Sequence, residues 1–170
     1  MKTRLVTLLC ASLVLAFSAT AFAQLKANSE EDKAYRKITA EKNPDTQLTM
    51  LQDFEKQFPQ SKALPDVYMM VVDYYTAKGD NAKVAEYGEK ALKVDPQNVA
   101  ALLAVSRSLT IQRKNLEVAV SYAQKAVDNV EKMKTQPAPG NYSDAEWKQL
   151  IKDNEEAAKG QLTYSKAIKQ

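Results

Sequence analysis

The chain has 170 residues, with 24 basic and 21 acidic side chains, no histidine and a single cysteine, Cys10. A formal charge of +3 is too small for a general attraction to nucleic acid or anionic lipid, so we expect no nucleic-acid partner. Without histidine, and with Cys10 in a segment that we expect to be removed, imidazole bases, thiol nucleophiles and the usual zinc sites are excluded. We therefore expect no enzyme, no metal and no cofactor.

The N-terminus has the pattern of a secretory signal peptide. Lys2 and Arg4 precede an apolar run over Leu5–Phe17, and an Ala-Phe-Ala cleavage site ends at Ala23. Cleavage there would make Gln24 the first mature residue and place the protein in the periplasm or outside the cell. The run is too short to span a membrane as a helix.

Removing residues 1–23 takes away two basic residues and no acid, which lowers the formal charge from +3 to +1. The remaining 147 residues are enough for one domain with a real core. No second long apolar run follows, so we expect no integral membrane segment after cleavage.

Residues 29–61 are predicted to form a first pair of helices. Acidic residues after Ser29 suit the positive end of a helix dipole, and Asn43-Pro44 separates the two helices. Apolar residues recur at helical spacing in both helices: Ala34, Tyr35 and Ile38, then Leu48, Leu51, Phe54 and Phe58.

Residues 63–96 are predicted to form a second pair. Gly79 can adopt the left-handed conformation that ends a helix, and Asp80 can cap the next one. Pro96 is expected at the first position of the following helix. Apolar stripes occupy both helices: Val67, Tyr68, Val71, Val72 and Tyr75, then Val84, Ala85, Gly88, Ala91 and Leu92.

The remaining chain is predicted to hold a third pair over 97–134, a loop over 135–142 and a long helix over 143–170. Arg113-Lys114-Asn115 separates the helices of the pair, and Ser143 with Glu146 forms a capping box before the last helix. Trp147 is expected to anchor that helix. The helix is either a terminal cap or the first half of a further repeat.

The second pair closely resembles a tetratricopeptide repeat, a helix-turn-helix unit of about 34 residues. The resemblance depends on Tyr68, Tyr75, the Lys78-Gly79-Asp80 turn, Lys90-Ala91-Leu92 and Asp95-Pro96-Gln97-Asn98. Gly88 departs from it, since the family prefers a large residue there, and so do Val72 and Val84, where it prefers small ones; these departures suggest a shifted helix contact. The ending Phe58-Pro59-Gln60-Ser61 is similar to that of bacterial envelope proteins of the same superfamily. The resemblance implies an all-α fold, with the pairs stacked as a short right-handed solenoid.

This resemblance also implies a function, a non-enzymatic exported scaffold that binds a protein or peptide in its concave groove. The alternative is a structural subunit of a cell-envelope assembly complex. The family's clamp for a C-terminal carboxylate is not matched here. Carried over by position, the groove residues are Asp66, Met69, Asp73 and Thr76 from one repeat, and Leu103, Arg107 and Thr110 from the next.

Other candidates for chemistry have simpler structural interpretations. A hydrolase would need a pair of carboxylates, but Glu30, Glu31 and Asp32 are interpreted as a solvated helix start. Residues Asp153, Glu155 and Glu156 are interpreted as a solvated helix face. Tyr68 and Tyr75 are expected in the core, and Tyr87 and Tyr122 half exposed at its flank.

Overall fold

The structure is a computed structural model that describes residues 25–140 and 142–170. In these residues it contains helices and no strand, which confirms the predicted all-α class. The predicted signal peptide and its cleavage site at Ala23 lie outside the described residues. The helices are α1 (Glu30–Ala40), α2 (Pro44–Gln57), α3 (Leu64–Lys78), α4 (Asn81–Val94), α5 (Val99–Ile111), α6 (Leu116–Met133) and α7 (Asp144–Lys169).

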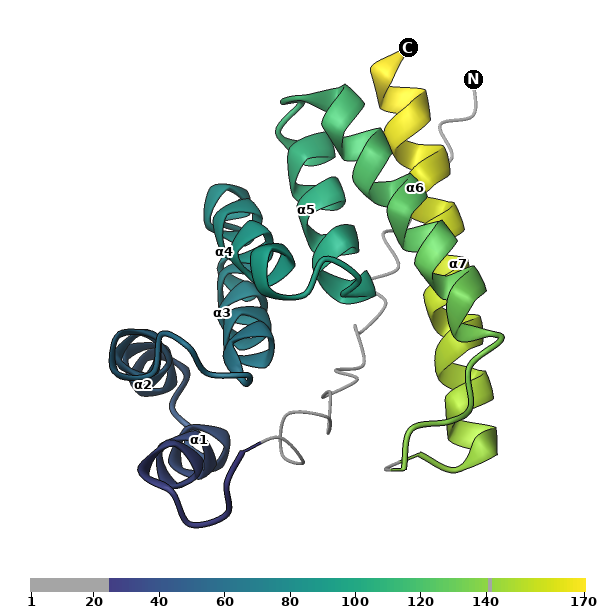
Figure 1. The fold of residues 1–170 in the computed structure, drawn as a ribbon. Coiled ribbons are helices and arrows are strands. Elements are labelled where there is room, and N and C mark those ends of the chain that lie inside the picture. Colours follow the sequence, from purple (N-terminus) through teal and green to yellow (C-terminus); the bar gives the residue numbers. More distant parts are fainter. Residues whose placement is uncertain (1–24, 141) are drawn as a thin grey trace.

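The helices pack mainly against their neighbours in the sequence. Each helix contacts the next one, and α5 also contacts both α3 and α7. In Figure 1, α1 and α2 lie at one end of the row and α7 lies at the other. This packing is compatible with an α-solenoid, in which each unit contacts only adjacent units.

Two clusters of apolar side chains form most of the core. The first cluster joins α1, α2, α3 and α4 and includes Ala101 of α5, and the second joins α5, α6 and α7. The buried members of the second cluster are Val99, Leu102, Ala126, Val130, Ile151 and Ala158. Leu92 of α4 packs against both clusters and thereby connects them.

Helix ends follow the local signals of the sequence in most places. Gly79 has a φ of 73°, and the side chain of Asp80 accepts a hydrogen bond from the N–H of Lys83 at 3.0 Å. The Ser143–Glu146 capping box is formed as predicted. The prediction for Pro96 is wrong, since α5 begins three residues later and Asn98 caps it, accepting from the N–H of Ala101.

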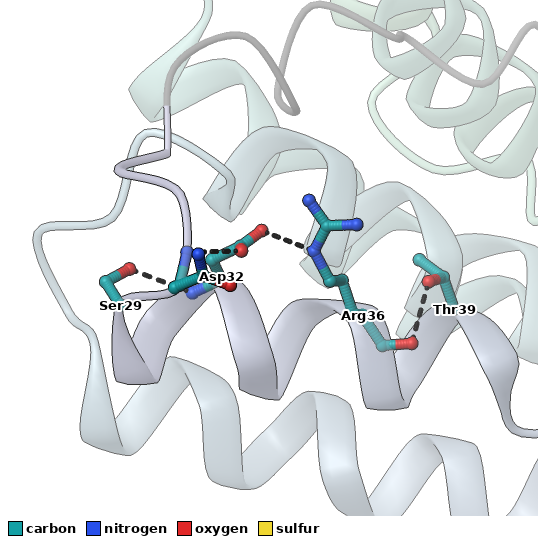
Figure 2. A network of polar contacts seen from close by, with 5 residues as sticks. Ser29, Asp32, Arg36 and Thr39 are labelled. Atoms are coloured by element: carbon teal, nitrogen blue, oxygen red, sulfur yellow. Dashed lines mark hydrogen bonds and ion pairs between the residues drawn. The ribbon is translucent and has the colours of Figure 1, made fainter.

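Asp32 and Glu155 are both interpreted as solvated from the sequence, but Asp32 is buried and Glu155 is partly buried. Asp32 is 2% exposed, and Figure 2 shows its carboxylate held from both sides. It accepts from the backbone N–H of Asn28 and from Nε of Arg36, both at 2.9 Å. The N–H of Asn28, more than Arg36, lowers the pKa of Asp32. The carboxylate therefore orders the chain that enters α1.

Glu155 is the second such residue, with a side chain that is 25% exposed. It pairs with Lys134, 2.8 Å away at the end of α6, and with Lys159 on its own helix. These two ammonium groups lower the pKa of Glu155 to about 2. The bridge to Lys134 ties the start of the 135–142 loop to α7.

Gly88 permits close approach of α4 to α5. It is buried, and a Cβ at this position would lie 2.6 Å from Cγ2 of Val105. A side chain there would clash, because valine in a helix has few alternative rotamers. This contact explains why a glycine occupies position 88.

We predict that Gly88→Ala lowers the free energy of unfolding by about 1–2 kcal/mol, since overpacking outweighs alanine's better helix propensity. Gly160→Ala is the matched control, because Gly160 is helical and a Cβ there meets nothing within 4 Å. The control should gain about 0.5–1 kcal/mol. Urea denaturation measures the free energy of unfolding of both variants. Equal changes in the two variants would contradict the close contact between Gly88 and Val105.

Candidate functional site

The four predicted groove residues of α3 share one face of the helix. Asp66, Met69, Asp73 and Thr76 follow one another at spacings of three and four residues. The first three are half-buried and Thr76, near the end of α3, is exposed. Met69 packs against the first core cluster, so it completes the core and also reaches the surface.

The three predicted groove residues of α5 have different environments. Arg107 is exposed, and Leu103 is half-buried against the second core cluster. Thr110 is 1% exposed. The expectation that Thr110 lines an accessible groove is therefore not met, because α7 covers it.

A buried polar network holds α7 over this part of α5. The Thr110 hydroxyl lies 2.9 Å from that of Ser165, and Ser106 donates to the carbonyl of Ala119 at 2.8 Å. The amide of Gln161 donates to the hydroxyls of Ser106, Thr110 and Ser165. Because buried polar groups are costly unless paired, this network favours one register of α7 on α5.

Asp73 has the most distinctive electrostatic setting of the predicted residues. Burial raises its pKa to about 6. Within residues 25–140 and 142–170, its carboxylate has neither a hydrogen bond nor an ion pair. A partly desolvated carboxylate without a partner is destabilising at neutral pH, because burial favours the protonated form.

Asp66 lies toward the α1 side of the same face. Burial, and secondarily the charge of Asp66, raises the pKa of the Tyr35 hydroxyl above its ordinary value. Tyr35 comes from α1 and is fully buried. The α3 face thus begins beside α1 and continues along α3 to Asp73.

The structure also contains a row of four tyrosines that the sequence only partly suggested. Neighbouring rings of Tyr74, Tyr75, Tyr87 and Tyr68 have centroid distances of 5.2, 5.9 and 6.3 Å. Tyr87 is 6% exposed, so the prediction of a half-exposed Tyr87 is wrong. Tyr75, predicted in the core, is half-buried beside the first core cluster.

Lys90 lies over the Tyr87 ring of this row and forms an ion pair with Glu55 of α2. Its ammonium lies 4.4 Å from the ring centroid of Tyr87 and 2.9 Å from the carboxylate of Glu55. Glu55 also accepts from the Tyr68 hydroxyl at 3.1 Å. These internal pairings join α2, α3 and α4, and they favour a structural role for the row.

Comparisons with known proteins identify no relative. No protein-family model matches the sequence, and neither a curated protein nor a solved structure matches it. Among the described residues, no group of three or more acidic, cysteine or histidine side chains could hold a metal ion. No helix in the part of the chain that the structure describes is long and apolar enough to cross a membrane.

Proposed function

We propose that this chain is a non-enzymatic, exported helical-repeat scaffold that binds a protein or peptide along the exposed face of α3 and α5. The observation that carries the proposal is Asp73, a half-buried carboxylate that has no partner among the described residues. An unpaired carboxylate in such a setting costs stability. A cationic group from a partner would remove that cost and gain a partly desolvated ion pair.

The neighbours of Asp73 define the partner's chemistry. Met69, one turn earlier, offers apolar surface, and Asp66 adds a second carboxylate on the same face. A segment with a lysine or arginine next to an apolar residue would complement this face. The exposed Arg107 on the neighbouring α5 would take an acidic group of the same partner.

The arrangement of the helices supports a scaffold role. Successive helices pack as neighbours, and α3 also contacts α5. Stacked helix pairs commonly present a binding surface to extended ligands. The right-handed tetratricopeptide arrangement is part of this proposal, as is action in the periplasm after cleavage at Ala23.

We predict that Asp73→Asn stabilises the fold at neutral pH. The raised pKa means that Asp73 destabilises the folded state above about pH 6, and that this penalty disappears as the pH falls toward 4. Because Asp73 is partly exposed, the gain at pH 7 should be about 1–2 kcal/mol. Thermal melts between pH 4 and 7.5 should show the two proteins converging at the acidic end.

The same variant should weaken binding of a basic partner. A displayed peptide library selected on the wild-type protein should enrich Lys or Arg next to an apolar residue. Asp73→Asn should bind the enriched peptides about threefold to fivefold more weakly, as expected for loss of a partly exposed ion pair. Asp128→Asn, at an exposed position on α6, is the matched control.

A variant Asp73→Asn that is more stable but binds more weakly would identify Asp73 as a binding residue, because loss of a structural residue would lower stability. Peptides without a basic preference, or equal binding to Asp73→Asn, would contradict the proposal. Co-purification of a stoichiometric partner that resists high salt would instead favour the alternative, a structural subunit of an envelope assembly.

A further inference from the structure

A separate cavity, which is open to solvent, lies between α4, α5 and α6, and none of its lining residues belongs to the α3 and α5 residues described above. Its volume is about 310 Å³. The lining residues combine apolar and charged side chains: Glu89, Leu92, Lys93, Pro96, Leu102, Tyr122 and Lys125.

Local hydrogen bonds hold the walls of this cavity in place. The side chain of Asn129 on α6 donates to the carbonyl of Gln97 in the α4–α5 turn at 3.2 Å. Asp95 accepts from the N–H of Gln97 at 3.0 Å, which fixes the turn itself. Leu102 is 1% exposed and belongs to the second core cluster, so this apolar part of the lining is rigid. The backbone that carries the lining residues of the cavity is therefore held in place.

The charged side chains around the cavity form no ion pairs with other described residues. Lys93 and Lys125 make no ion pair with any acidic residue of 25–140 and 142–170, and Glu89 makes none with a basic one. Lys125 lies over the ring of Tyr122, 5.7 Å from its centroid. Burial, with a smaller effect of the Glu89 charge, raises the pKa of the Tyr122 hydroxyl.

We propose that this cavity binds a small organic monocarboxylate with an apolar body. The carboxylate would pair with the ammonium groups of Lys93 and Lys125, and the body would pack on Leu92 and the Tyr122 ring. Glu89 leaves the lining with a net charge of +1, which suits one carboxylate and disfavours a second.

Three probes test separately whether the carboxylate and the apolar body of the ligand contribute to binding. 3-Phenylpropionate has both the carboxylate and the apolar body, 3-phenylpropanamide lacks the charge, and acetate lacks the body. In NMR titrations of the ¹⁵N-labelled protein, 3-phenylpropionate should shift amides around Leu92, Leu102 and Tyr122 with a Kd of the order of a millimolar. The amide and acetate should each bind at least about fivefold more weakly.

A charge-neutral variant identifies the groups responsible. Lys93→Gln with Lys125→Gln should abolish the preference for the acid over the amide, while both probes keep shifting the same residues. Lys152→Gln, at an exposed position on α7, is the matched control and should keep the preference. Equal binding of acid and amide to the wild type, or a preference that survives the double variant, would overturn the proposal.

A peptide probe tests the source of the carboxylate. A short N-acetylated peptide ending in phenylalanine presents the same group on a longer chain. Because the terminal phenylalanine alone would occupy the lysine pair and the apolar lining, the rest of the peptide should add no contact, and the peptide should bind no more tightly than 3-phenylpropionate. Tighter binding of the peptide would overturn the assignment to a small molecule and would identify a chain terminus as the ligand.

Discussion

Ala91→Asp and Ala126→Asp are each expected to unfold the protein or to lower its free energy of unfolding by at least about 3 kcal/mol. Both alanines are 0% exposed, Ala91 on α4 in the first core cluster and Ala126 on α6 in the second. An unpaired buried carboxylate costs several kcal/mol, which is comparable to the total stability of roughly 5–15 kcal/mol. Helical circular dichroism with a thermal melt measures the loss.

Ala82→Asp is the matched control on the same helix as Ala91. Ala82 is exposed in the first turn of α4, where a carboxylate favours the helix dipole. This variant should stay within about 0.5 kcal/mol of the wild type. A melt of Ala91→Asp or Ala126→Asp within a few degrees of the wild type would mean that the register of α4 or α6 is wrong.

Phe54→Ala is expected to cost about 3–5 kcal/mol, the range for removing a buried aromatic ring. Phe54 is 2% exposed, and its ring lies 6.2 Å from that of Tyr35 on α1 and 4.9 Å from that of Phe58. Because α1 packs mainly against α2, loss of this ring should loosen that end first.

Hydrogen exchange would show where the stability is lost. In Phe54→Ala, the amides of α1 and α2 should exchange at least tenfold faster, while those of α6 and α7 should change little. Phe58→Ala, which removes a half-buried ring at the end of α2, should have a smaller effect. Uniform loss of protection along the whole chain would contradict a modular fold and indicate a single cooperative unit.

Local sequence signals were sufficient for the helices and most of their ends. Gly79 and Asp80 act within one turn of the chain, as do Ser143 and Glu146, so their roles follow from nearest neighbours alone. The wrong prediction at Pro96 is also a local one, only three residues from the observed start of α5 at Val99. The Asn98 side chain accepts a hydrogen bond from the N–H of Ala101 and so caps the helix, which therefore does not begin at Pro96. Apolar periodicity likewise identified the buried faces that hold Ala91 and Ala126.

Burial of individual polar and aromatic side chains could not be predicted in this way. Asp32 is buried because the chain that enters α1 folds back so that Asn28 donates to it, which helical periodicity does not encode. Tyr87 is buried because rings from α3 cover it. Thr110 was placed on an open face, and only the docking of α7 brings Ser165 and Gln161 against it.

The sequence by itself thus determined the all-helical class and the apolar stripes, since these depend on residues three or four positions apart. Only the tertiary structure decided which polar side chains are buried and which of them form hydrogen bonds or ion pairs. Asp73 shows the difference most clearly. Its position on the α3 face follows from spacing, whereas its raised pKa follows from desolvation by the folded protein around it.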